Sequence, residues 1–84
     1  MAETILNDDW SDYDDPKIRD NRDSRFFSCE EKWERDYLIG KIQKHYPQFT
    51  SKQIEDAIDQ CCITIAAPRP RRTFVECVMK RLRG

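Results

Sequence analysis

The stretch FTSKQIEDAIDQCC, residues 49–62, carries the clearest structural signal in this chain of 84 residues. Thr50 is followed three residues later by Gln53, which is the spacing of a capping box at the start of an α-helix. Apolar residues then recur with the i, i+3, i+4, i+7 spacing of an amphipathic helix. They are Ile54, Ala57, Ile58 and Cys61. We therefore expect a helix over about residues 50–62 with one buried face.

Two further helices are predicted on either side of this one. Upstream, Ser28 and Glu31 have capping-box spacing and Pro47 blocks helix continuation, which predicts a helix over about residues 29–46. Downstream, an apolar stripe followed by a basic last turn predicts a helix over about residues 71–83. The intervening connector, ITIAAPRPRR, contains two prolines and is expected to be irregular. The predicted fold class is all-α, a small three-helix domain.

The N-terminal segment, residues 1–25, is acidic and poor in aliphatic side chains. Such a composition buries too little apolar surface to offset the roughly 1–2 kcal/mol per residue that backbone ordering costs. We therefore expect two parts: an acidic, mostly flexible segment over residues 1–25 and a three-helix domain over residues 26–84.

Three features of the N-terminal segment stand out from its acidic background. Trp10 and Tyr13 are large aromatic residues, which we expect to dock either on a partner or on the domain itself. Asp15-Pro16 suits the opening of a short helix, because proline is favoured at a first helical position.

Charge is segregated along the chain, although the formal net charge is only -1. Residues 1–28 contain eight acidic and four basic side chains, whereas residues 63–84 contain one acidic and six basic side chains. The basic end permits an anionic partner, and it equally permits the acidic segment to fold back and screen it. The candidate binding residues come from both ends. They are Trp10, Tyr13, Arg69, Arg71, Arg72, Lys80, Arg81 and Arg83.

The chain has four cysteines, and their spacing does not favour a metal site. Zinc modules usually pair ligands as Cys-x-x-Cys, whereas the only close pair here is the adjacent Cys61-Cys62. No metal and no cofactor is therefore predicted. The first ten residues lack the basic start and apolar run of a secretory signal, so we expect a cytoplasmic protein with reduced thiols. No charge-free stretch is long enough to span a bilayer, so no membrane contact is expected.

The stretch from Ile42 to Leu82 is similar to ubiquitin-binding three-helix modules of the CUE and UBA type. The similarity lies in an aromatic–proline turn after a helix, here Tyr46-Pro47, and in apolar pairs near the end of the third helix. The chain departs from the family pattern at both places. The methionine-phenylalanine-proline signature reads His45-Tyr46-Pro47, and the paired leucines read Val78-Met79. The function predicted below does not depend on this resemblance.

The sequence predicts a binding protein rather than an enzyme. Nothing in it resembles a catalytic triad or a two-metal carboxylate site, so no catalytic residue is assigned. We expect a small non-enzymatic helical module that binds another protein. The alternative is a nucleic-acid-binding protein that uses the C-terminal basic cluster, and a thiol- or zinc-dependent regulator is less favoured. Because three short helices make a small core, a homo-oligomer is also left open.

Overall fold

The capping box predicted at Thr50 is present in the structure and starts a helix with one buried apolar face. The Thr50 side-chain oxygen accepts a hydrogen bond from the Gln53 backbone N–H at 3.1 Å, and the Gln53 side chain accepts one from the Thr50 N–H at 2.8 Å. Helix α4 (Ser51–Thr64) follows and buries the four residues of the predicted stripe. This helix prediction is confirmed.

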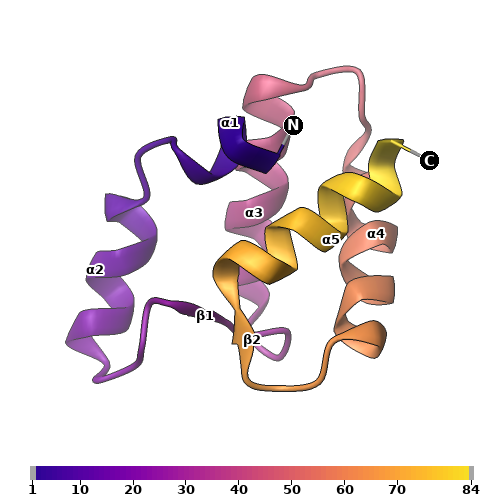
Figure 1. The fold of residues 1–84 in the computed structure, drawn as a ribbon. Coiled ribbons are helices and arrows are strands. Elements are labelled where there is room, and N and C mark those ends of the chain that lie inside the picture. The colour runs from indigo at the N-terminus through magenta and orange to yellow at the C-terminus, as the bar shows by residue number, and fades with distance from the viewer. Residues whose placement is uncertain (1, 84) are drawn as a thin grey trace.

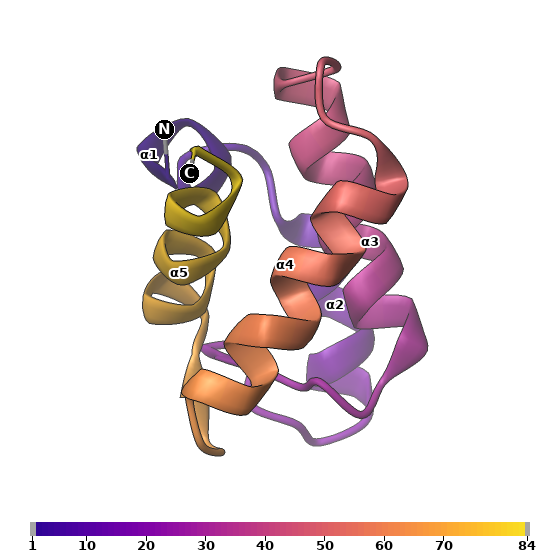
Figure 2. The ribbon, with the colours of Figure 1, turned by 90° about the vertical axis from the view of Figure 1, so that its right-hand side faces the viewer.

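Residues 2–83, the part of the chain that the computed structural model describes, form five helices and two short strands (Figure 1). In chain order they are α1 (Ala2–Leu6), α2 (Ser11–Arg19), β1 (Phe26–Phe27), α3 (Lys32–His45), α4 (Ser51–Thr64), β2 (Arg69–Pro70) and α5 (Arg71–Arg83). Helix α4 packs against both α3 and α5, and the short α1 bridges α3 and α5 (Figure 2). Met1 and Gly84, the outer ends of the predicted segments 1–25 and 26–84, lie outside the described residues.

The helix predicted over residues 29–46 is confirmed, but its predicted capping box is wrong. Helix α3 begins at Lys32, with Glu31 as an N-cap that makes no side-chain capping bond. Ser28 is engaged elsewhere. Its hydroxyl donates to the Glu30 carboxylate at 3.2 Å, and its backbone N–H donates to the Glu34 carboxylate at 3.0 Å. The segment before α3 is therefore held by local hydrogen bonds to two glutamate side chains rather than by the predicted capping box.

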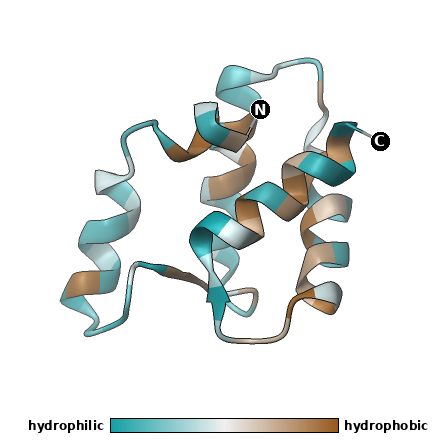
Figure 3. Ribbon diagram, viewed as in Figure 1, coloured by the Kyte–Doolittle hydropathy of each residue, from teal (hydrophilic) through white to brown (hydrophobic). Residues whose placement is uncertain are grey.

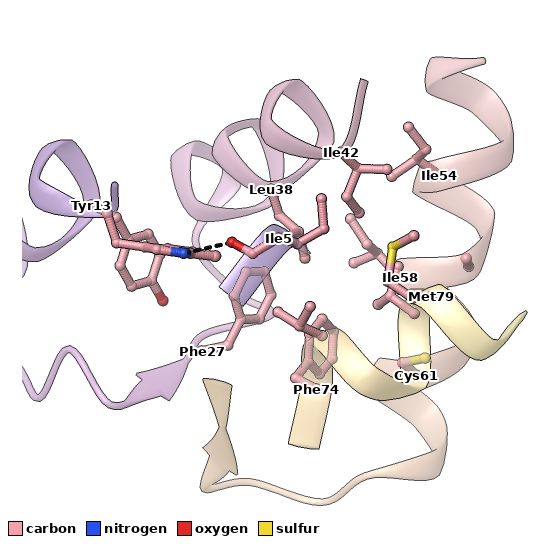
Figure 4. Packing of buried hydrophobic residues seen from close by; sticks show 14 residues of the cluster. Ile5, Tyr13, Phe27, Leu38, Ile42, Ile54, Ile58, Cys61, Phe74 and Met79 are labelled. Carbon is pink, nitrogen blue, oxygen red and sulfur yellow. Dashed lines mark hydrogen bonds between the residues drawn. The ribbon is translucent and has the colours of Figure 1, made fainter. Parts of the chain in front are cut away.

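The N-terminal segment is ordered, so the prediction of a flexible segment is wrong. Ile5 and Tyr13 are fully buried and Trp10 is 5% exposed, all within the core cluster. The Trp10 indole N–H donates to the Ile5 carbonyl at 3.0 Å, and Figure 4 shows Ile5 beside Leu38 in the core. A few large buried side chains thus order a segment whose average composition is hydrophilic.

Helix α2 also begins earlier than the sequence predicts. It starts at Ser11, whose backbone N–H donates to the Asp9 carboxylate at 2.9 Å. Pro16 lies inside the helix, so the expectation that Asp15-Pro16 opens it is wrong. The helix persists past the proline because its inner side, which carries Tyr13 and Lys17, is buried against the rest of the fold.

Part of the connector that was expected to be irregular, residues Arg69–Pro70, forms strand β2 of a small two-stranded sheet. Strand β1 pairs antiparallel with β2, with Phe26 opposite Pro70 and Phe27 opposite Arg69. Phe27 stacks on Phe74 of α5 with ring centroids 4.4 Å apart. Strand β2 leads directly into α5, whose predicted bounds of 71–83 are confirmed.

All four cysteines form disulfides, so the prediction of reduced thiols is wrong. Cys29 pairs with Cys62, which ties the segment before α3 to the end of α4, and Cys61 pairs with Cys77 of α5. The two adjacent side chains of α4 diverge around the helix, and each therefore meets a different element. Disulfides persist in oxidising compartments, so the expected cytoplasmic location loses its support from the thiols. No helix among residues 2–83 has the length and apolar character needed to cross a membrane.

We expect Trp10→Ala to lower the free energy of unfolding by about 3–5 kcal/mol, because it removes a large buried side chain. The control is Ile18→Ala, which truncates a side chain of α2 that is 65% exposed. It should change the free energy of unfolding by no more than about 0.5 kcal/mol. The measurement is guanidinium unfolding of the oxidised protein. Similar small effects for both variants would contradict the packing of the N-terminal segment.

Candidate functional site

The structure separates the eight predicted binding residues into two groups. Four are buried or held by internal contacts: Trp10, Tyr13, Arg69 and Arg71. The other four are exposed on α5: Arg72, Lys80, Arg81 and Arg83. Only the second group contributes to an open surface.

Trp10 and Tyr13 dock on the domain itself, which is one of the two possibilities that the sequence left open. Their rings meet edge to face with centroids 5.2 Å apart. The Arg71 guanidinium lies 4.6 Å from the Trp10 ring centroid and forms an ion pair with Asp14 at 2.9 Å. Arg71 is therefore part of the packing between α2 and the start of α5.

Arg69 closes the C-terminal end of α4. Its guanidinium donates to the carbonyl oxygens of Ile65, at 2.7 Å, and Cys62, at 3.0 Å. Carbonyl groups at a helix end have no partner within the helix, and a basic side chain is a common way to satisfy them. Arg69 also lies 3.7 Å from the Glu30 carboxylate and is only 11% exposed. It is thus engaged within the fold.

A buried ionic junction between α2 and α3 went unnoticed in the sequence. Glu34 is fully buried, and one of its carboxylate oxygens accepts hydrogen bonds from the Tyr13 hydroxyl at 2.6 Å, Lys17 Nζ at 3.0 Å and the Ser28 backbone N–H at 3.0 Å. Lys17, itself 2% exposed, also donates to the Phe26 carbonyl. The only local signal for this junction is the i, i+4 spacing of Tyr13 and Lys17.

The chemistry of the junction is structural rather than reactive. Burial, followed by the hydrogen bond to Glu34, raises the pKa of the Tyr13 hydroxyl well above its usual range, so the phenol stays protonated. The second Glu34 oxygen makes no hydrogen bond with the described part of the chain, but the Arg22 guanidinium lies 3.5 Å from it. A cleft of about 250 Å³ opens beside the junction, and Lys17, Arg22 and Arg69 line it. Each of these three cations already has an internal acidic partner.

Within residues 2–83, most of the basic side chains that form no ion pair lie on the exposed part of α5. Ten of the fifteen lysine and arginine side chains form ion pairs with acidic residues in the described part of the chain. The five that form none there are Arg19, Arg72, Lys80, Arg81 and Arg83. Four of these five belong to α5, although Arg72 also lies in the electrostatic field of Glu3.

Four charged residues share one outer face of α5. Arg72, Glu76, Lys80 and Arg83 are spaced i, i+4, i+8 and i+11, and all four are exposed. We call them the α5 charge face. Glu76 has the spacing for ion pairs with Arg72 and Lys80, but within residues 2–83 it forms an ion pair with neither. Arg81 lies beside this face, where it lines a groove of about 330 Å³ between α4 and α5 with Leu82.

Comparison with known proteins finds no relative for this chain. No family model, no curated protein and no solved structure matches it at a significant level. The similarity to CUE and UBA modules therefore gains no support from these comparisons. The features above define a small, mostly helical domain held by two disulfides, with the α5 charge face as its candidate site.

Replacing Lys17 tests the buried junction. We expect Lys17→Met to lower the free energy of unfolding by about 3–5 kcal/mol, because it leaves the Glu34 carboxylate buried without its main counter-charge. Adding Glu34→Gln to this variant removes the stranded charge, so the double variant should be more stable than Lys17→Met alone. Urea unfolding measures both. A double variant that is less stable than the single one would contradict this assignment.

A second ionic cluster pins the chain before α2 to the end of α3. One carboxylate oxygen of Asp8 lies 2.7 Å from His45 Nε2, 3.2 Å from Lys41 Nζ and 3.4 Å from Lys44 Nζ. The hydrogen bond with His45 is the main cause that holds the pKa of Asp8 well below its usual range, followed by the Asp9 backbone N–H. An acid of the N-terminal segment is thus neutralised by basic side chains at the end of α3.

The depressed pKa of Asp8 predicts a pH dependence of stability. A carboxylate with a lowered folded-state pKa stabilises the fold fully above the unfolded-state value of about 3.9, and this contribution is lost as the pH falls below it. Asp8→Asn should therefore lower the melting temperature at neutral pH and flatten its decline in acid. Asp12→Asn, at an exposed carboxylate outside the cluster, is the matched control. If the melting temperatures of Asp8→Asn and the wild type fall in parallel from neutral pH into acid, the assignment is contradicted.

Proposed function

We propose that this protein is a small, disulfide-bonded helical module that binds another protein through the α5 charge face. The observation that carries the proposal is the distribution of unpaired charge. Most basic side chains are used in ion pairs within the fold, whereas Lys80 and Arg83 are exposed and have no acidic partner among residues 2–83. Exposed charges left on one helix face are available to a partner.

The sign pattern of the face favours a protein over a nucleic acid. At a rise of about 1.5 Å per residue, Arg72 and Arg83 lie about 16 Å apart along the helix, with Glu76 between them. A phosphate backbone would meet the Glu76 carboxylate with like charge, whereas a protein can present a basic side chain to it. Arg69 and Arg71, on which the nucleic-acid alternative also drew, are engaged internally.

The disulfides bear on where the module works. Two disulfides in a chain of this size are typical of proteins that function in an oxidising environment. We therefore place the protein in an oxidising compartment, secreted or extracellular, as part of the proposal. Together the two disulfides use all four cysteines. In this oxidised state no thiol is left to act as a metal ligand or as a redox sensor. Within residues 2–83 no group of three or more histidine, cysteine or acidic side chains is arranged to hold a metal ion.

The DNA-binding alternative is tested by reversing the charge of Glu76. Fluorescence anisotropy with a short labelled duplex at low salt should show weak binding to the wild type and several-fold tighter binding to Glu76→Lys, because the change removes the one acid from the face. Glu55→Lys, at an exposed acid on α4, is the matched control. Strong wild-type binding that falls steeply with salt and ignores Glu76→Lys would contradict the proposal.

Protein binding is tested by a photo-crosslinking amino acid at position 73, in cells that express the chain. The exposed Thr73 is spaced i, i+7 from Lys80, so this position lies beside the α5 charge face and leaves its four charges in place. Adducts should resist nuclease, should be lost on Arg72→Glu with Arg83→Glu, and should be far weaker when the crosslinker is at position 52 on α4. The proposed function would be contradicted if no position-specific protein adduct formed, or if nuclease removed the adduct.

A further inference from the structure

The outer face of α2 carries a second set of exposed charges that lack partners. Asp12, Asp15 and Arg19 are spaced i, i+3 and i+7, so they lie on one side of the helix. All three are exposed, and within residues 2–83 none of them forms an ion pair. Figure 3 shows α2 as mostly hydrophilic, with one hydrophobic band toward its C-terminal end, where Ile18 is 65% exposed. We call Asp12, Asp15 and Arg19 the α2 charge face.

The two charge faces have complementary patterns. The α2 charge face reads negative, negative, positive with intervals of three and four residues. Read from its C-terminal end, the α5 charge face begins Arg83, Lys80, Glu76, which is positive, positive, negative with the same intervals. Antiparallel helices would therefore place Arg83 opposite Asp12, Lys80 opposite Asp15 and Glu76 opposite Arg19. A parallel arrangement would lose this register, because the order of the intervals is reversed.

These faces do not meet within one molecule. Helix α2 touches the beginning of α5 through Asp14 and Arg71, 2.9 Å apart. From there the C-terminal half of α5 runs away from α2, which lies at the opposite side of the molecule in Figure 1 and at the back, behind α4, in Figure 2. The complementary charges can therefore pair only between two molecules.

We propose that the α5 charge face binds the α2 charge face of a second copy of this chain, with the two helices antiparallel. This inference rests on the proposed function and names its partner. The contact is heterologous, so each copy keeps one free face of each kind, and the assembly closes into a ring or extends as a chain. Exposed ion pairs are individually weak and screened by salt, so self-association is expected at high protein concentration and low ionic strength. Ile18 adds an apolar contact beside the charges.

Two variants that each disable one face give the sharpest test. Lys80→Gln with Arg83→Gln disables the α5 charge face, and Asp12→Asn with Asp15→Asn disables the α2 charge face. Each variant alone should self-associate about tenfold more weakly than the wild type in sedimentation velocity at low salt. An equimolar mixture should form a heterodimer that does not grow further, because each molecule then offers one intact face. Lys32→Gln with Lys52→Gln, which removes the same charge from exposed sites elsewhere, should leave assembly unchanged.

Three results would overturn the inference. The first is a wild-type protein that stays monomeric at low salt and high concentration. The second is a mixture of the two variants that shows no heterodimer although the wild type assembles. The third is a loss of assembly in the control that equals the loss in the face variants. In each case a protein adduct at position 73 to a different partner would leave the proposed function standing, whereas loss of that adduct as well would remove both.

Discussion

A buried carboxylate, that of Glu34, holds the N-terminal segment on the helical core. It belongs to α3, and its hydrogen-bond donors come from Tyr13 and Lys17 of α2 and from the backbone of Ser28 after β1. An unpaired charge at a fully buried position would be strongly unfavourable, so α2 and β1 must stay where they are for this carboxylate to remain satisfied. The junction also positions Trp10 and Arg71, because both lie against the ring of Tyr13. Arg71 in turn lies over the Trp10 ring.

The parts of the fold that could be predicted from sequence are those encoded by neighbouring residues. The capping box at Thr50 and the apolar stripe behind it act over one or two turns, and α4 and α5 follow the prediction closely. The errors concern partners that are distant along the chain. Lys17 and Glu34 meet over 17 residues, and Cys29 and Cys62 over 33, without any local pattern that announces them. The expectation of a flexible N-terminal segment failed because average composition hides a few buried side chains such as Ile5.

The segregation of charge along the sequence serves two purposes in the structure. Part of it is internal: Asp8 pairs with the basic end of α3, and Asp14 pairs with Arg71. The pair of Asp14 and Arg71 is an instance of the screening of the basic end that the sequence left open, and it removes Arg71 from the candidate site. The remaining charges stay at the surface, on the α2 charge face and the α5 charge face, whose sign patterns are complementary. Four of the eight candidate residues lie on α5 as exposed cations, because basic side chains on a predicted amphipathic helix usually face solvent, whereas the burial of Trp10 and Tyr13 depends on tertiary packing.

Native-state amide hydrogen exchange of the oxidised, full-length chain tests most directly whether the Glu34 junction holds the N-terminal segment in place. The backbone N–H of Asp14 donates to the Trp10 carbonyl, just before α2, at 2.8 Å, and the backbone N–H of Arg22 donates to the Lys17 carbonyl, within α2, at 2.7 Å. If α2 is fixed by the junction, these amides will exchange as slowly as those of α3, and Lys17→Met will speed them selectively relative to α4. Exchange at the rate of an unstructured peptide in the wild type, with α3 and α4 protected, would contradict this account of the fold.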